Sequence, residues 1–123
     1  MKIRIKGNSI RYRLTKTEIA NFGKLGYVEE ETRFLNGPSF HYRLERRPGI
    51  TSLDASYTEN RICIYVPEPI ASEWTATEVV GFNHTLDTGG GNKLFLLIEK
   101  DFVCLDHTFE DQSDNYPNPN KTC

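Results

Sequence analysis

The sequence predicts a single α+β domain, built as a mostly antiparallel sheet or a partly open barrel of about eight strands with two short helices. Its 123 residues are enough for one domain that buries its own core without metal or disulfide bonds. Eight segments alternate apolar and polar residues with the two-residue period of a strand, and two others carry helix signals. Residues 1–105 are expected to form this domain, and the acidic, Pro- and Asn-rich residues 106–123 a tail.

The first two strands form a predicted hairpin. The alternating runs Lys2–Lys6 and Ser9–Leu14 flank a Gly-Asn pair, which readily adopts the positive φ angles of a two-residue turn. This turn places Arg4 opposite Arg11. Since like charges opposite each other destabilise a strand pair, this side of the hairpin requires acidic neighbours, solvent or a bound anion.

The other elements follow in chain order. Thr15 and Glu18 form a capping box at the start of a helix, and a second, short helix is expected at residues 69–74. The run Leu94–Ile98 is apolar on both faces, which predicts a central strand covered on both sides. The remaining predicted strands are Tyr27–Phe34, Ser39–Glu45, Leu53–Tyr57, Arg61–Val66, Val79–Leu86 and Lys93–Val103, the last of which contains this apolar run.

The order of two strands, a helix and two strands occurs twice along the chain. A shift of 52 residues places turn and apolar positions on one another, including Asn8 on Asn60, Ile10 on Ile62 and Phe22 on Trp74. This pattern predicts a ββαββ duplication with an approximate two-fold relation between the halves. The alternative is strand periodicity that the two halves share without common origin.

Charge is distributed unevenly. The net charge is −2, but residues 1–50 carry +6 and residues 51–123 carry −8. Such asymmetry is typical either of an anion-binding surface or of two halves that neutralise each other across the fold. Nucleic-acid binding is not expected, because a sequence pI near 5.9 gives no general attraction to phosphate backbones.

Compartment and membrane association are predicted from the cysteines and the apolar runs. Cys63, Cys104 and Cys123 form an odd set without CxxC spacing, which does not fit a disulfide framework or a zinc ribbon. No apolar run approaches the ~20 residues of a membrane span, and the amino-terminal residues alternate charged with apolar side chains, unlike a signal peptide. We therefore expect a cytoplasmic protein without membrane association.

Two clusters are candidate ligand sites. The basic hairpin can hold a phosphate or carboxylate, because arginine offers a planar fork of donors to such anions; its candidate residues are Lys2, Arg4, Arg11 and Arg13. The acidic region near the carboxyl end can bind a divalent metal through carboxylate and imidazole groups. Its candidate ligands, which match no closed metal motif, are Asp106, His107, Glu110, Asp111 and Asp114.

Three stretches carry a resemblance to known proteins: KIRIKGNSIRYRLTKTE, VVGFNHT and LLIEKDFVCLD with the later EDQSDNYPNP. Together they are similar to a family of small uncharacterised bacterial proteins over nearly the whole chain. The resemblance implies a stand-alone bacterial domain and brings no activity, cofactor or catalytic residue with it.

The sequence therefore predicts a binding or interaction domain that is not catalytic, with a protein partner or a small anionic ligand. The alternative is a metal- or phosphoanion-dependent enzyme that uses the acidic cluster and the basic hairpin. A further hypothesis is that the acidic segment 106–114 folds back over the hairpin and relieves the repulsion between Arg4 and Arg11.

Overall fold

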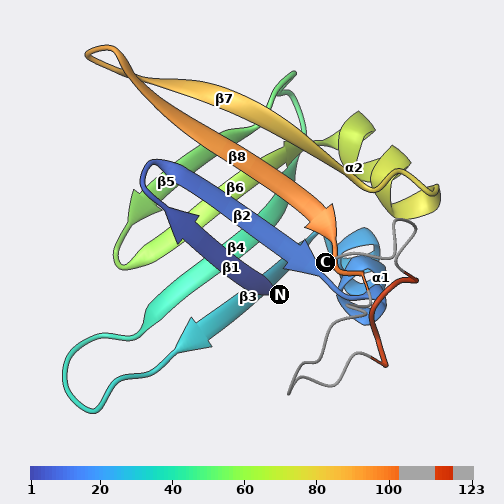
Figure 1. Ribbon diagram of the computed structural model, residues 1–123, viewed down its shortest axis with the longest axis horizontal. Coiled ribbons are helices and arrows are strands. Elements are labelled where there is room, and N and C mark those ends of the chain that lie inside the picture. Colours follow the sequence, from blue (N-terminus) through green and yellow to red (C-terminus); the bar gives the residue numbers. More distant parts are fainter. Residues whose placement is uncertain (103–112, 118–123) are drawn as a thin grey trace.

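The computed structural model describes residues 1–102 and 113–117 (Figure 1). Eight strands and two helices are present in these residues, which confirms the predicted α+β class. Their bounds are β1 Lys2–Lys6, β2 Ser9–Leu14, α1 Lys16–Leu25, β3 Tyr27–Thr32, β4 Phe40–Arg47, β5 Asp54–Thr58, β6 Arg61–Pro67, α2 Glu68–Ala76, β7 Gly81–Gly89 and β8 Asn92–Lys100.

The strands form two four-stranded sheets. Sheet A has the order β1-β2-β8-β7 and sheet B the order β3-β4-β6-β5. The outer pairs of both sheets are antiparallel, as predicted, but the central pairs β2–β8 and β4–β6 are parallel. The hairpin turns determine the antiparallel pairs, whereas each parallel pair joins strands from different hairpins, which sequence periodicity does not reveal.

The strand pairing repeats in the manner that a ββαββ duplication predicts. In the first unit, β1 and β2 enter sheet A and β3 and β4 enter sheet B; in the second, β5 and β6 enter sheet B and β7 and β8 enter sheet A. The registers are equivalent as well: Lys2 pairs with Arg13 in sheet A, and Asp54, 52 positions later, pairs with Tyr65 in sheet B. Each sheet therefore combines one hairpin from each unit.

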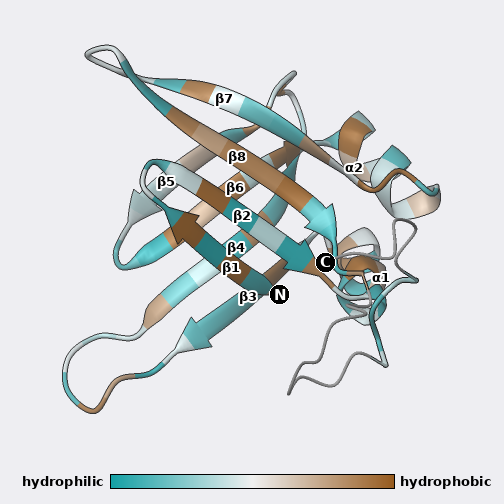
Figure 2. Cartoon of the chain, in the orientation of Figure 1, coloured by the Kyte–Doolittle hydropathy of each residue, from teal (hydrophilic) through white to brown (hydrophobic). Residues whose placement is uncertain are grey.

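The core lies between the inner faces of the two sheets, and the helices lie at one end of them (Figures 1 and 2). Tyr12 of sheet A and Tyr42 of sheet B approach to 5.9 Å between ring centroids. Burial of such side chains contributes about 1.5–3 kcal/mol each. The largest fully buried residues are Trp74, Tyr12, Phe22, Leu14, Leu44, Ile64, Leu96, Ile98, Val66 and Pro67.

The two helices join the sheets through aromatic residues. The ring of Trp74 in α2 lies 6.0 Å from Phe22 of α1 and 5.1 Å from Phe82 of β7, in edge-to-face geometry. The indole Nε1–H donates to the carbonyl oxygen of Val80 at 3.0 Å, so the polar atom of this buried side chain is satisfied. Trp74 thus anchors the core at the point where the two helices meet β7.

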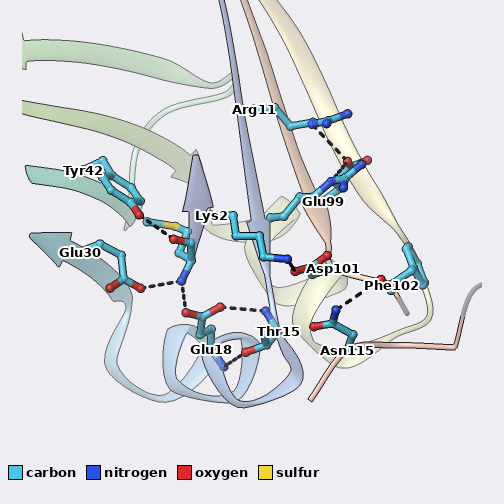
Figure 3. Close-up of polar contacts among 12 residues, drawn as sticks. Lys2, Arg11, Thr15, Glu18, Glu30, Tyr42, Glu99, Asp101, Phe102 and Asn115 are labelled. Carbon is cyan, nitrogen blue, oxygen red and sulfur yellow. Dashed lines mark hydrogen bonds and ion pairs between the residues drawn. The ribbon is translucent and has the colours of Figure 1, made fainter. Parts of the chain in front are cut away.

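The amino terminus is held between α1 and sheet B (Figure 3). The Met1 ammonium group contacts the carboxylate of Glu18 and, at 2.5 Å, that of Glu30. Glu18 also completes the capping box with Thr15, as predicted. Burial alone raises the pKa of Glu18, but the hydrogen bonds from the ammonium group and from the Thr15 backbone N–H lower it overall.

Three local predictions need correction. β3 ends at Thr32, and the exposed Phe34 lies beyond it rather than on a strand face. The second helix is longer than predicted, Glu68–Ala76. The run Leu94–Ile98 is a central strand of sheet A, but only its inner face is covered: Phe95 on the outer face is 38% exposed. The described helices lie at the end of the sheets and leave this outer face open (Figure 1).

Candidate functional site

The outer face of sheet A gathers the hairpin cations on one side and apolar residues on the other. Strand registers align this face in three rows across β1, β2, β8 and β7, because alternate residues of neighbouring strands share a face. The row nearest the helices is Lys2, Arg13, Glu99 and Gly81. The middle row is Arg4, Arg11, Leu97 and Asn83, and the third is Lys6, Ser9, Phe95 and Thr85.

Acidic residues neutralise the row nearest the helices. The Nε atom of Arg13 lies 2.8 Å from Oε1 of Glu99, and that of Arg11 lies 3.7 Å from the same atom. Nζ of Lys2 lies 2.9 Å from the buried carboxylate of Asp101 (Figure 3). This part of the hairpin therefore obtains the acidic neighbours that the sequence requires.

The other two rows contain two cations that lack an acidic partner among the described residues. Arg4 stands directly opposite Arg11, and within residues 1–102 and 113–117 neither Arg4 nor Lys6 forms an ion pair. Burial lowers the pKa of Arg11, as do its neighbours Arg13 and Arg4, against the opposing effect of Glu99. A shallow hollow of about 190 Å³ opens here, lined by Arg4, Lys6, Ser9, Arg11, Phe95 and Leu97.

The equivalent position on sheet B is also hollow but is neutralised. This hollow measures about 290 Å³ and is lined by Arg43, Glu45, Ser56, Thr58, Arg61, Cys63 and Tyr65. Its arginines are paired: Nε of Arg61 lies 2.8 Å from Oε1 of Glu29, and Nε of Arg43 lies 2.9 Å from Oε1 of Glu45. Burial raises the pKa of the Cys63 thiol, which disfavours the reactive thiolate.

The structure separates the four residues of the predicted anion site into two pairs. Arg4 and Arg11 line the hollow, whereas Lys2 and Arg13 lie in the adjacent row and contact acids. Sequence reasoning did not assign Lys6, although its place in the alternating strand puts it on the same face. It also missed Phe95 and Leu97, because their place beside Arg11 and Ser9 depends on the parallel pairing of β2 with β8.

The predicted metal ligands fall largely outside the described residues: Asp106, His107, Glu110 and Asp111 all do. Asp114 is described, and its carboxylate accepts a hydrogen bond from the Thr17 hydroxyl at 3.1 Å. In the described part of the chain, no group of three or more His, Cys, Asp or Glu residues is placed to hold a metal ion.

The segment 113–117 packs beside the start of α1. The backbone N–H of Lys16 donates to the Asp114 carbonyl at 3.0 Å, and that of Tyr116 donates to the Asp101 carbonyl at 2.8 Å. Hydrogen bonds from Thr15 first, and then from Thr17, lower the pKa of Asp114. Asp114 therefore contacts the helix start, while residues 106–112 lie outside the described residues, so the folding of segment 106–114 over the hairpin stays a prediction.

Fold and site together define a two-sheet α+β domain with a basic hollow on one outer face. The chain belongs to a family of unknown function, DUF7009, whose model matches residues 1–120. No curated protein and no solved structure matches the chain. Among the described residues, no helix is long and apolar enough to cross a membrane.

Proposed function

We propose that this protein is a binding domain that holds an anionic group of its ligand on the outer face of sheet A. The binding groups are the guanidinium groups of Arg4 and Arg11 and the ammonium group of Lys6. One observation carries the proposal: Arg4 lies directly opposite Arg11 beside a hollow, and Arg4 and Lys6 have no acidic partner among the described residues.

Electrostatics favour an anion at this position. Two like charges opposite each other destabilise a strand pair by several tenths of a kcal/mol, and a bound anion reverses the sign of that interaction. Hydrogen bonds that involve charged groups contribute about 1.5–3 kcal/mol each. Arginine suits phosphate and carboxylate because its planar fork can donate two parallel hydrogen bonds.

The proposed ligand is small. The hollow measures about 190 Å³, below the roughly 300–1,000 Å³ of pockets that enclose drug-sized molecules. The chain as a whole carries a net charge of −2, so a long polyanion gains no general attraction outside the hollow.

We also propose a bacterial, cytoplasmic location. Cys63 is a free, buried thiol, which suits a reducing compartment. The bacterial origin rests on the resemblance of the terminal stretches to uncharacterised bacterial proteins.

Titration with inorganic phosphate at low ionic strength, followed by NMR of backbone amides, tests the proposal. We expect saturable shifts in β1 and β2, and at least tenfold weaker binding in Arg4→Gln. Arg33→Gln is the matched control, because Arg33 is an exposed arginine just beyond β3, paired with Glu31 and outside the hollow. Equal affinity of Arg4→Gln and the unmodified protein contradicts the proposal.

A further inference from the structure

We infer that the ligand is a small amphipathic anion whose charged group lies over β1 and β2 and whose flat, apolar body lies on Phe95 and Leu97 of β8. This inference rests on the proposed function and deepens it by specifying the chemical class of the ligand. It arises from the apolar half of the hollow, which an inorganic anion leaves unused.

Two apolar side chains stand beside the cations on this outer face. Phe95 is 38% exposed, and Leu97 is half-buried beside it on the same face. The equivalent positions on the outer face of sheet B, defined by the registers of the two parallel pairs, are His41 and Arg43. At these two positions sheet B thus has charged or polar side chains, whereas sheet A has an aromatic and an aliphatic side chain at the hollow.

The registers place the charged and apolar halves side by side. Ser9 pairs with Phe95, and Arg11 pairs with Leu97. Neighbouring strands lie about 4.8 Å apart, so one small molecule can contact the cations of β1 and β2 and the apolar surface of β8 at once. The hollow is lined by residues of all three strands.

The volume of the hollow matches an apolar body of about one ring. A dry cavity of about 150 Å³ in another protein accommodates benzene, and this hollow measures about 190 Å³. A single ring with one phosphate or carboxylate group therefore fits the space.

Residues of β7, on the side of β8 away from the cations, determine the orientation of the ligand. Across β7 the two rows continue with the exposed, uncharged Asn83 and Thr85. The next charges along this side are Asp87 and Lys93, which pair with each other at 3.1 Å. The anionic group is therefore attracted toward β1, and Asn83 and Thr85 offer hydrogen bonds to a polar substituent on the far side of the ring.

Phenyl phosphate and inorganic phosphate separate this inference from the proposed function. Both are titrated by calorimetry at about pH 8, where both are mainly dianions, and at equal ionic strength. We expect phenyl phosphate to bind the unmodified protein at least tenfold more tightly than inorganic phosphate does. In Phe95→Ser, this ratio of affinities should fall below threefold. Phe34→Ser is the matched control, since Phe34 is an exposed phenylalanine in the loop after β3, and it should retain the full ratio.

The outcomes are distinct. Equal affinity for the two phosphates in the unmodified protein overturns the amphipathic ligand and leaves the anion site intact. The amphipathic ligand is also overturned if Phe95→Ser still binds phenyl phosphate at least tenfold more tightly than inorganic phosphate. Circular dichroism checks that Phe95→Ser and Phe34→Ser are folded. If neither compound binds, the proposed function is overturned, and the inference with it.

Discussion

The outer faces of sheets A and B occupy equivalent places in the repeated fold and carry their charges differently. In the middle and third rows, sheet A has Arg4, Arg11 and Lys6 without an acid, a net charge of +3. The corresponding rows of sheet B combine two arginines and a histidine with two glutamates. Sheet B thus neutralises its cations within the fold, whereas Arg4 and Lys6 of sheet A have no acidic partner among the described residues.

The difference depends on few positions. The registers place Asn83 of sheet A at the position equivalent to Glu29 of sheet B, and Thr85 at that of Glu31. An equivalent backbone therefore carries either a self-neutralised face or a face with an excess of cations, depending on whether the outer edge strand supplies carboxylates. The following changes test this comparison, ordered from the largest expected effect on stability to the smallest.

Gly81→Ala tests the row nearest the helices, where sheet A requires glycine and sheet B has Tyr27. A Cβ atom at Gly81 would lie 2.3 Å from the Ile98 carbonyl oxygen, so the backbone must shift. We expect a loss of about 1–3 kcal/mol in the free energy of unfolding, measured by urea denaturation.

Gly23→Ala is the control for that change. A Cβ atom at Gly23, in α1, would lie 3.5 Å from Thr75, an ordinary contact, and alanine favours the helix by about 0.5–1 kcal/mol. Equal destabilisation by the two substitutions would contradict the close approach of β7 to β8.

Glu29→Gln tests the self-neutralised face. Oε1 of Glu29 lies 2.8 Å from Nε of Arg61 and 3.8 Å from the Arg43 guanidinium group, so the substitution leaves two arginines less compensated. We expect a loss of about 1–2 kcal/mol by thermal denaturation, and a smaller loss at high salt. Asn83→Gln, at the equivalent position of sheet A, should change stability little because Asn83 forms no such pairs in the described residues; a comparable loss there would refute the contrast.

Glu18→Gln tests the pH dependence of the amino-terminal contact. Because the folded state lowers the pKa of Glu18, its stabilising contribution is complete above the ordinary carboxyl pKa of about 4.5 and is lost as the pH falls through the lower folded value. Removing the charge costs on the order of 1 kcal/mol near neutral pH, the usual scale for a lost helix cap. The melting temperatures of variant and parent should converge on acidification below that range; a constant difference at all pH values would contradict this assignment.

Ser9→Glu adds a carboxylate to the outer face of sheet A, although from β2 rather than from the edge strand that supplies the carboxylates in sheet B. Ser9 lies opposite Lys6 on the outer face, so a glutamate there supplies the missing carboxylate. We expect stability within about 0.5 kcal/mol of the parent, as for exposed ion pairs, but at least tenfold weaker phosphate binding. Ser9→Gln, which adds similar bulk without charge, should bind phosphate more tightly than Ser9→Glu; equal affinities would show that bulk rather than charge weakens binding.

Much of the fold could be predicted from the sequence because its signals are local. The two-residue turn fixed the register of β1 and β2, and with it the opposition of Arg4 and Arg11. The capping box located the start of α1. The repeated order of elements anticipated the equivalent pairing of the two sheets.

The rest of the site depends on a non-local pairing. Phe95 and Glu99 reach the hairpin only because β8 lies parallel to β2, although more than 80 residues separate them along the chain. The apolar run of β8 predicted cover on both faces, yet the described helices pack at the end of the sheets and leave Phe95 exposed. Neither the acid that neutralises Arg13 nor the apolar half of the hollow could be inferred without that pairing.

The melting temperature of Arg4→Gln, with and without phosphate, tests the central claim most directly. Without phosphate, the variant should melt about 1–3 °C above the parent, because the repulsion between Arg4 and Arg11 is removed. With saturating phosphate, the order should reverse, because the parent binds the anion in its native state and the variant binds it weakly. A variant that melts below the parent by the same amount in both conditions would contradict the account, since Arg4 would then stabilise the fold without serving a ligand.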